Sequence, residues 1–404
     1  MTAPASQSAV LDVAAIGIGP MNLALAALAD EVPELRFEAY DAKPAFDWHP
    51  GLMFDWASLQ VSFLADLVSL VRPTSRWSFL SYLVERDRMY PFYIAERFHI
   101  PRREYADYCA WVASSLPSCR FGVSIGSVSW NGELWTLTGS DGVTRRARNV
   151  VLGVGTTPAL PDVLAGVDGV CHSGEYLLRD LSGARQVAVV GSGQSGAEVF
   201  LDLVRRQRDA GWAVTWLTRT PSFAPLDYSK LVLEYTTPEY MRYFHALPPA
   251  RRDKLVASQW QLYKGIDTET IDAIHVELYD HLLDGDRPPV RLLPGVTVSS
   301  ATPGVTVSSA APGVTLGCEH RDTGQRFDVH ADAVVAATGY LARRPDLLEP
   351  VADLIDWDPR GRYQIEVDHR IRTHCGGGLY VQNAELHTHG AAAPDLGIAA
   401  YRSA

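Results

Sequence analysis

The stretch VLDVAAIGIGPMNLALAALA, residues 10–29, decides the fold of the N-terminal part of this chain. Residues 10–16 form an apolar run typical of a buried strand, and residues 21–29 favour a helix. Gly17 and Gly19 lie between the two. A second strand is expected over 35–40, so the pattern predicts a strand–helix–strand (βαβ) unit.

The glycine turn has the properties of a dinucleotide cradle. Gly17 permits a tight turn, Gly19 lets the backbone approach a pyrophosphate, and the helix N-terminus offers unpaired N–H groups. Asp41 follows the second strand, 22 residues after Gly19, where its carboxylate can accept a hydrogen bond from a ribose hydroxyl. The sequence therefore predicts that a dinucleotide binds at this turn.

A second unit of the same kind begins at residue 186. The apolar run 186–190 leads through GSGQSG, residues 191–196, into a helix over 197–207, and a strand over 214–217 follows. Arg219 stands after this strand in place of an acid. A carboxylate would repel the 2′-phosphate of NADPH, whereas a guanidinium can pair with it. The two units together predict electron transfer from NADPH to a bound flavin.

The remaining segments predict an α/β fold with two Rossmann-like dinucleotide-binding domains, one for FAD and one for NADPH, and a mainly helical insert that binds substrate. Residues 78–116 have helical periodicity, whereas 119–152 favour short strands with turns at Asn131-Gly132 and Asp141-Gly142. A nine-residue repeat from Pro294, PGVTVSSAT and then PGVTVSSAA, favours a β-meander. The buried run 333–337 is expected to return the chain to the first domain. The expected domains are the FAD-binding domain (8–180 and 330–404), the NADPH-binding domain (181–224 and 286–329) and the insert (225–285).

The composition argues against several classes of function. The 404 residues carry a net charge of −11, which disfavours binding to nucleic acid. No apolar stretch reaches the roughly 18 residues of a membrane span, and the N-terminus lacks the features of a secretory signal. The five cysteines form no C-x-x-C pair, and scattered reduced thiols fit a cytoplasmic protein. His387 and His389 have the spacing of a metal pair but lack a third ligand cluster, so we expect no metal.

Motifs along almost the whole chain resemble the flavin-dependent N-hydroxylating monooxygenases of siderophore biosynthesis. They occur in the order found in that family, and their combination is specific. The motifs are Gly17–Leu23, Asp47–Gly51, Leu59–Leu64, Pro73–Ser75, Phe79–Leu83, Pro101–Tyr105, Gly191–Ser195, Ala337–Tyr340 and His387–Gly390. The stretches Tyr263–Asp267 and Val381–Ala384 are similar to the branch that acts on putrescine or cadaverine.

The resemblance implies an enzyme that uses FAD, NADPH and O2. NADPH reduces the flavin, the flavin forms a C4a-hydroperoxide with O2, and a neutral primary amine takes the distal oxygen. An amine with a pKa near that of lysine, about 10.4, is almost fully protonated at neutral pH, so the site must favour loss of its proton and exclude water. The resemblance further implies a homo-oligomer, often a tetramer, and relatives that continue through a helix beyond Ala404.

The resemblance also assigns roles to individual residues. Gln60 is the amide near the reactive edge of the flavin, and Gln60 and Asn383 are expected to act in catalysis. The flavin side of the site is expected to include Gly17, Gly19, Pro20, Asn22, Asp41, Lys43, Trp48, His49, Gln60, Thr338, Gly339, Asp395, Leu396 and Gly397. The last three belong to a closing segment that resembles the one lining both flavin and substrate. The NADPH side is expected to include Gly191, Gly193, Gln194, Ser195 and Arg219.

Two positions indicate the substrate. Relatives that act on lysine or ornithine commonly have lysine where this chain has Ala65, and ornithine enzymes have asparagine where it has Leu233. Alanine and leucine cannot hold the α-carboxylate of an amino acid, and burying that carboxylate without a partner costs on the order of several kcal/mol. We therefore expect a diamine, putrescine or cadaverine. Lysine or ornithine stays open as an alternative if Lys264 or Lys230 supplies the missing cation.

The distal ammonium of a diamine needs an acid or a carbonyl group. Asp227, Glu234 and Glu385 are candidates, and with Gln60, Ala65, Leu233 and Lys264 they make up the expected substrate site. Three other functions compete with this one. A flavin disulfide reductase needs a C-x-x-C pair, and a Baeyer–Villiger oxygenase needs a glycine spacing that fails before His172. A non-catalytic flavoprotein would bind FAD but form no product from an amine.

Overall fold

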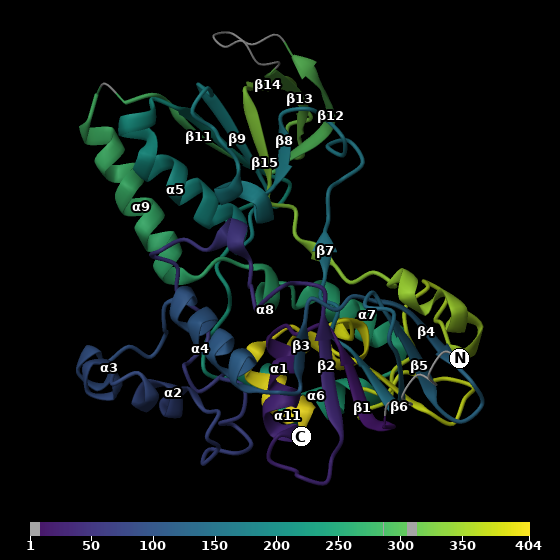
Figure 1. The fold of residues 1–404 in the computed structure, drawn as a ribbon. Coiled ribbons are helices and arrows are strands. Elements are labelled where there is room, and N and C mark those ends of the chain that lie inside the picture. Colours follow the sequence, from purple (N-terminus) through teal and green to yellow (C-terminus); the bar gives the residue numbers. More distant parts are fainter. Residues whose placement is uncertain (1–8, 286, 305–312) are drawn as a thin grey trace.

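The computed structural model of the chain describes residues 9–285, 287–304 and 313–404. Two halves are joined by a narrow ribbon (Figure 1). The ribbon consists of β7 (Thr157–Pro158) and β16 (Tyr340–Leu341), which pair antiparallel. The first half contains the turn at Gly17, and the second contains the turn at Gly191.

The sheet of the first half is mixed. Its strands follow the order β3-β2-β1-β6-β5-β4, and β17 also pairs with β6. The pairs β2–β3, β1–β2, β1–β6 and β6–β17 are parallel, whereas β4–β5 and β5–β6 are antiparallel. Gly132 and Gly142, at φ 100° and 76°, confirm the two expected turns on either side of β5. The strands are β1 (Leu11–Ile16), β2 (Phe37–Asp41), β3 (Cys119–Phe121), β4 (Ile125–Trp130), β5 (Trp135–Gly139), β6 (Thr144–Leu152) and β17 (Gly378–Val381).

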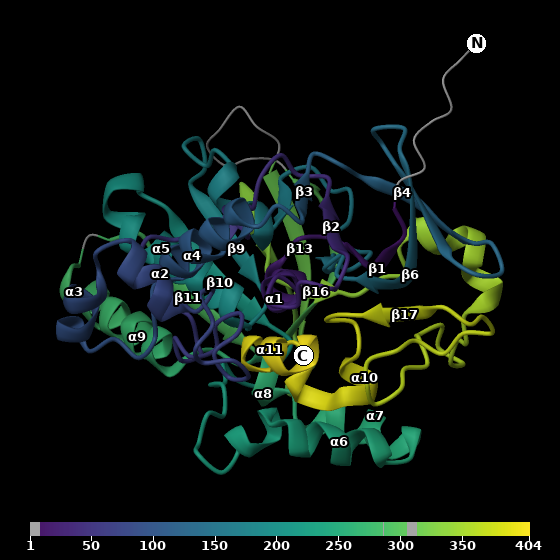
Figure 2. The ribbon, with the colours of Figure 1, turned by 60° about the horizontal axis from the view of Figure 1, so that its bottom comes forward.

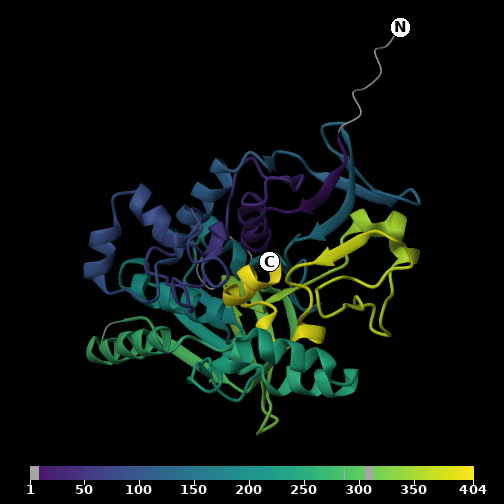
Figure 3. The same cartoon turned by 90° about the horizontal axis from the view of Figure 1, so that it is seen from below.

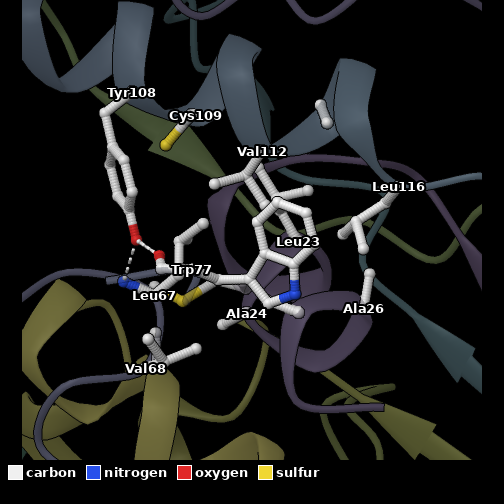
Figure 4. Close-up of a cluster of buried hydrophobic side chains, with 14 of the residues drawn as sticks. Leu23, Ala24, Ala26, Leu67, Val68, Trp77, Tyr108, Cys109, Val112 and Leu116 are labelled. Atoms are coloured by element: carbon white, nitrogen blue, oxygen red, sulfur yellow. Dashed lines mark hydrogen bonds between the residues drawn. The ribbon is translucent and has the colours of Figure 1, made fainter. Parts of the chain in front are cut away.

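Helix α1 packs against this sheet, and α2 to α4 lie beside it. α1 (Pro20–Ala29) starts directly after the glycine turn with a proline, whose fixed φ suits the first helical position, and most of its residues are buried. α4 (Arg102–Ser115) packs on it, and in Figure 4 Leu23 of α1 lies near Val112 of α4. α2 (Phe79–Glu85) and α3 (Met89–Ala95) precede α4. The helical segment expected over 78–116 is confirmed.

The second half has a parallel sheet in the order β11-β10-β9-β15-β8. The turn at Gly191 follows β9 and leads into α5 (Gln194–Ala210), so the second βαβ unit is confirmed. α5 begins inside the expected turn, three residues before Ala197. The strands are β8 (Val170–His172), β9 (Gln186–Val190), β10 (Ala213–Thr218), β11 (Val290–Pro294) and β15 (Ala333–Ala336).

A smaller antiparallel sheet lies beside this one. It consists of β12 (Val296–Gly304), β13 (Gly313–His320) and β14 (Arg326–Ala331). The β-meander expected from the repeat is thus present over its described part. Most of the second copy falls within 305–312, outside the described residues.

Two of the expected domain boundaries are wrong. β8 falls in the range expected for the FAD-binding domain, yet it pairs with β15 in the second sheet. β15, expected to belong to the first domain, pairs with β9 as well. The chain crosses between the halves at β7 and β16 instead. Buried parallel strands have similar apolar sequences whichever sheet they join, so pattern alone could not place these two.

The helical segment 225–285 also divides between the halves. α6 (Pro238–Ala246), α7 (Pro249–Ser258) and α8 (Gln261–Lys264) lie beside the C-terminal segment, whereas α9 (Thr268–Leu283) packs on α5. Ile266 and Ile274 are buried in the core of the second half. The expected insert is therefore not one packed unit, because its last helix belongs to the second half.

The C-terminal segment connects α1 with the insert helices (Figures 2 and 3). After β17 it forms α10 (Leu386–His389), which contacts α6 and α7, and α11 (Ala399–Ser403), which contacts α1. Over the described ranges, no helix has the length and apolar character of a membrane span. The same ranges hold no group of three or more His, Cys, Asp or Glu side chains arranged for a metal.

Candidate active site

The turn between β1 and α1 fits a pyrophosphate. Gly17 has a φ of +89°, and a Cβ there would lie 2.3 Å from the carbonyl oxygen of Gly153, so only glycine fits. A Cβ at Gly19 would have no atom within 4 Å, so open space faces the turn. No side chain caps α1, and the N–H groups of its first turn are available to an anion.

Asn22 holds this turn from behind. It is 1% exposed, and its Nδ2 atom donates to the carbonyl oxygens of Ile16 and Gly17. Its Oδ1 atom accepts a hydrogen bond from Nε2 of Gln382 at the end of β17. Asn22 is therefore engaged by the chain and acts on a cofactor through the shape of the turn.

Asp41 supports the same turn from β2. Its Oδ2 atom accepts the N–H of Ile18 at 2.8 Å, and its Oδ1 atom accepts the N–H of Lys43 at 2.9 Å. The carboxylate oxygens keep lone pairs that a ribose hydroxyl can use. Lys43 is exposed, and its Nζ atom donates to the carbonyl oxygen of Asp47.

Gln60 carries the clearest sign of a missing ligand. Its Nε2 atom is buried and has no hydrogen-bond partner within the described part of the chain. Leaving a buried amide donor unsatisfied costs about 1–3 kcal/mol, so an acceptor from outside the chain is expected. The flavin position that the resemblance implies for Gln60 would supply one.

Trp48 and His49 extend from this region toward the ribbon. The Trp48 ring lies 5.3 Å from that of Tyr105 in α4. His49 has a left-handed backbone, φ 52°, and its ring lies 6.1 Å from that of Tyr340 in β16. Both side chains therefore lie on the side of the first half that faces the second.

Thr338 and Gly339 tie the crossing strands together. The Thr338 hydroxyl donates to the carbonyl oxygen of Ala159, whose N–H donates to the carbonyl oxygen of Gly339. The same Gly339 oxygen lies 2.9 Å from Nε2 of His172. These bonds position the two halves relative to each other, whatever contact the two residues make with a flavin.

The second glycine turn has the same construction as the first. Gly191 has a φ of +123°, and a Cβ there would lie 2.1 Å from the carbonyl oxygen of Ala337. No side chain caps α5 at Gly193, so N–H groups of its first turn, which includes Ser195, are available to a phosphate. Arg219 is exposed and makes no ion pair with any described residue. The turn and this arginine fit a 2′-phosphorylated dinucleotide.

The side chain of Gln194 forms hydrogen bonds with residues at the start of α9. Its Oε1 atom accepts the N–H of Asp267, and its Nε2 atom donates to Glu198 and Thr270. Glu198 in turn forms an ion pair with Arg102 of α4 at 2.5 Å. Gln194 therefore belongs to a chain of contacts that joins the two halves.

Ala65 faces the C-terminal segment. It is 6% exposed, and a Cβ at Gly397 would lie 3.9 Å from the Ala65 methyl group. Asp395 accepts the N–H of Gly397 at 2.6 Å through Oδ1. Leu396, between them, packs on the apolar core of the first half. The structure thus brings Ala65 to the stretch 395–397, for which the resemblance implies contact with both flavin and substrate.

A tyrosine of the insert lies close to Asp395. Burial raises the pKa of Tyr228, and the nearby charges of Asp395 and Asp267 raise it further. Burial also raises the pKa of Asp395, against the opposing effects of the Gly397 N–H and the Arg402 charge. The stretch that meets Ala65 therefore carries a partly buried acid whose charge acts on the half-buried phenol of Tyr228.

The loop that carries Ala65 is rigidly held. Asp66, 3% exposed, accepts the N–H groups of Val68, Ser69 and Phe79. The Tyr108 hydroxyl accepts the N–H of Leu67 and donates to the carbonyl oxygen of Trp77, as Figure 4 shows.

The expected substrate residues of the insert lie further out. The Asp227 carboxylate accepts the N–H and the hydroxyl of Ser229. Leu233 is half-buried and Glu234 exposed, both on the helical turn Leu233–Thr236. Lys264 is exposed, with Nζ 5.4 Å from the ring centre of Tyr263. None of the contacts made by the described residues brings Glu234 or Lys264 to Ala65.

Glu385 is not available to a substrate, which corrects its place among the candidate acids. Its side chain is fully buried and forms an ion pair with Arg402, 1% exposed. Nδ1 of His369 lies 3.6 Å from the same carboxylate oxygen. Burial alone would raise the pKa of Glu385, but the charge of Arg402, with His369 nearby, outweighs burial and lowers the pKa to about 2. The acid already has its cation inside the chain.

Asn383 lies at the carboxyl end of β17. Its φ of 63° is left-handed, and it is partly exposed between the buried residues Gln382 and Glu385. Because β1, β6 and β17 are parallel, their carboxyl ends meet at one edge of the sheet, where the Gly17 turn also lies. Ligands bind at this edge in open α/β sheets.

Comparison with known proteins agrees with the resemblance. Residues 9–342 match the model of the family described as L-lysine 6-monooxygenase/L-ornithine 5-monooxygenase. The chain belongs to this family. It is a flavin-dependent N-hydroxylating monooxygenase.

The similarity extends over almost all of this chain and most of the length of its relatives. The putrescine N-hydroxylase of Shewanella oneidensis is 39% identical over 100% of this chain and 82% of its own length. The FAD-bound cadaverine monooxygenase DfoA of Erwinia amylovora is 38% identical with a TM-score of 0.93, covering 98% of this chain and 93% of its own. The ornithine N-hydroxylase KtzI of Kutzneria sp. 744, solved with FAD, NADP+ and L-ornithine, is 28% identical with a TM-score of 0.89 and covers 98% and 97%.

For this monooxygenase, two features of the site were missed from the sequence. Tyr228 has no motif signal, because its closeness to Asp395 results from tertiary packing. Asp395 was expected to line the flavin and the substrate, and its lack of an ion pair with any described residue was not predicted. The alanine at position 65 was a usable signal. A site that lacks a lysine there can accommodate a neighbouring acid, and an acid favours a cationic group of the substrate where a lysine would favour a carboxylate.

Proposed function

We propose that this enzyme hydroxylates one terminal amine of an aliphatic diamine, putrescine or cadaverine, in the synthesis of a hydroxamate siderophore. The observation that carries the proposal is the environment of Ala65. The stretch that meets Ala65 brings a partly buried acid, Asp395, and the neighbouring cation, Arg402, is bound to Glu385. Such a site favours a second ammonium group and disfavours an α-carboxylate.

Relatives support a diamine substrate. The Shewanella oneidensis and Acinetobacter baumannii putrescine N-hydroxylases are 39% and 35% identical to this chain, and DfoA is a cadaverine monooxygenase. L-lysine and L-ornithine are the competing substrates, because the family is named for them. The negative charge of Asp395, near Ala65, favours diamines over these amino acids as substrates.

We assign the distal ammonium of the diamine to Asp395. One of its oxygens accepts the Gly397 N–H, and no described residue donates to the other. Asp227 is engaged with Ser229, and Glu385 is neutralised by Arg402. A charge-assisted hydrogen bond to Asp395 would hold the far end of the substrate and so fix which amine reaches the reaction centre.

FAD and NADPH are the proposed cofactors. The turn at Gly17 would hold the FAD pyrophosphate, with Asp41 toward a ribose and Gln60 donating its free N–H to the flavin. The turn at Gly191 and Arg219 would hold NADPH. When bound, the reduced flavin supplies activated oxygen from O2 for transfer to nitrogen.

The residues around the reaction centre must also prepare the amine. An ammonium moved into a buried site loses hydration, which lowers its pKa and favours the neutral, nucleophilic form. Asp395 stabilises the distal charge, so desolvation acts chiefly on the amine that reacts. The rigid loop around Asp66 and the C-terminal segment exclude water from this space.

The same proposal assigns a role to each half of the molecule and to the insert helices. The first half would bind FAD, the second NADPH, and the helices α6 to α8 would close the substrate site. Assembly into a homo-oligomer, by resemblance a tetramer, and a place in the cytoplasm are part of the proposal. No nucleic acid partner is proposed for a chain of net charge −11.

A side-by-side assay of four amines tests the substrate. Purified enzyme with FAD and NADPH is given putrescine, cadaverine, L-lysine or L-ornithine, and the hydroxylamine product is measured. We expect the two diamines to be hydroxylated at least about 10-fold more efficiently, as one lost charged interaction implies. Preference for either amino acid would overturn the assignment at Ala65 and Asp395.

A further inference from the structure

A second candidate ligand site lies outside the diamine site, between α7 and the loop 358–372. It is a cavity of about 500 Å³, which we call the arginine cavity. His245 of α6 and His387 and Thr388 of α10 also line it. Its charged lining residues are Arg252, Arg360, Arg362, Arg372, Asp253 and Asp358. Four arginines face two aspartates in a chain that is strongly acidic overall.

Three of the four arginines are held by acids. Arg362 bonds Asp358 at 2.7 Å and Asp253 at 3.1 Å, and Arg360 lies 3.3 Å from the other oxygen of Asp253. Arg372 is fixed by Glu366, with Nε 2.6 Å from Oε1. The two aspartates of the lining are therefore already engaged, and these guanidinium groups are fixed in place.

Arg252 has no such partner. It forms no ion pair with a described residue, and its Nε atom is buried without a hydrogen bond. Its Nη1 atom reaches only the carbonyl oxygen of His245, at 3.4 Å. Burial lowers the pKa of Arg252, and the charges of Arg362 and Arg372 lower it further against the effect of Asp253.

A half-buried cation beside two other cations is costly unless an anion compensates for it. We propose that the arginine cavity binds a small organic polyanion that carries carboxylate or phosphate groups. A guanidinium group can bind either anion through parallel N–H groups, and Arg252 is the lining arginine that forms no ion pair with a described residue. Arg362 and Arg372, held by their own acids, contribute the N–H groups and the positive field that these ion pairs leave over. The volume lies within the range of small-molecule sites and is larger than a single ion requires.

The position of the cavity gives the anion a structural effect. Arg252 lies on α7 of the insert, whereas Arg362 and Arg372 lie on the loop of the first half. An anion between them replaces repulsion by attraction and so fastens the insert to the C-terminal segment. Occupancy is expected to stabilise the folded enzyme without entering the diamine site.

Direct titration of the full-length enzyme tests this site. Citrate and inorganic phosphate are titrated calorimetrically at constant ionic strength, as the carboxylate and phosphate arms, into wild type, Arg252→Met and Arg251→Met. Methionine retains the apolar length of the arginine stem but not its charge. Arg251 is the matched control, because it precedes Arg252 on α7, is exposed and does not line the cavity.

We expect one saturable site per chain for at least one of the two anions in wild type and Arg251→Met. Binding should be at least about 10-fold weaker in Arg252→Met, the loss of one charged hydrogen bond. Without anion, Arg252→Met should be at least as thermally stable as wild type, because the substitution removes an unpaired cation. If Arg252→Met fails to retain FAD, Arg372→Gln serves as the second variant and should weaken binding similarly.

Equal binding by all variants, or no saturable binding of either anion, would overturn the proposal. So would a stabilisation that sodium chloride of the same ionic strength reproduces. Self-association that depends on protein concentration and is lost in Arg252→Met would mean that a carboxylate of a second copy fills the cavity, which also contradicts a small-molecule site.

Discussion

Two acids of the C-terminal segment, ten residues apart, have opposite environments. Glu385 lies in a fully buried ion pair with Arg402, with His369 beside it. Asp395 is partly buried, and among the described residues its carboxylate accepts one hydrogen bond, from the backbone N–H of Gly397. Both are single acidic residues in a glycine- and alanine-rich sequence, and nothing in their spacing separates them.

The two acids differ in which positive charge compensates their carboxylates. Arg402 serves Glu385 and, through the carbonyl oxygen of Ala393 and the sulfur of Met21, fastens α11 to α1. No described residue forms an ion pair with Asp395, and Arg402, whose charge also acts on it, is paired with Glu385, so its counter-charge can come from a ligand. A buried acid paired within the chain is part of the structure, and one without a pair is a candidate for binding.

Removing the Glu385 charge should produce the largest effect, and on stability. Glu385→Gln leaves the Arg402 guanidinium buried without its partner, which costs about 3–5 kcal/mol. Urea unfolding of the FAD-loaded enzyme measures this loss. Glu234→Gln is the control, because Glu234 is exposed and should change stability by less than about 0.5 kcal/mol. A Glu385→Gln enzyme as stable as wild type, with a raised KM for diamine, would reverse the roles assigned here.

Asp395→Asn should affect the substrate instead. Its kcat/KM for putrescine should fall by about 30-fold or more, equivalent to about 2 kcal/mol, because the distal ammonium loses its charged partner. The sharp control is 1-aminobutane, which lacks that ammonium. Wild type and Asp395→Asn should hydroxylate it equally. Asp227→Asn should change putrescine turnover little, and a larger loss there than at Asp395 would move the subsite to the insert.

The comparison also shows how far sequence reasoning extends. β1, α1, β2, β9 and α5 were predicted because strand and helix periodicity and glycine turns are local signals. The boundaries at β8 and β15 were not, because pairing in a parallel sheet is set by distant strands. The pairing of Glu385 with Arg402, 17 residues apart through an irregular segment, follows no period. For the same reason Glu385 was kept as a substrate acid and Tyr228 was overlooked.

Ala65→Lys tests whether the acid beside position 65 decides the substrate. A lysine there would pair with Asp395 and repel the distal ammonium, so putrescine kcat/KM should fall about 10-fold. Ala65→Met adds similar length without charge and isolates the steric part of the loss. Activity on L-lysine relative to putrescine should rise in Ala65→Lys but not in Ala65→Met. An Ala65→Lys enzyme that turns over putrescine faster than wild type would contradict the proposed site.

The smallest expected effect is a difference in pH dependence. Glu385 has a pKa near 2 in the folded chain and 4.5 as its ordinary value, so the unfolded chain binds more protons between these limits. Its stabilisation is fully present above pH 4.5 and is lost as the pH falls toward 2. The pKa of Asp395 is raised above its ordinary value of 3.8, so just above pH 3.8 the folded chain binds more protons than the unfolded chain. The contribution of Asp395 to the free energy of unfolding therefore becomes less favourable as the pH rises through that range. Between pH 3 and 6, the slope of the unfolding free energy against pH should therefore become less positive in Glu385→Gln and more positive in Asp395→Asn. The same change in both variants would mean that the two carboxylates share one environment.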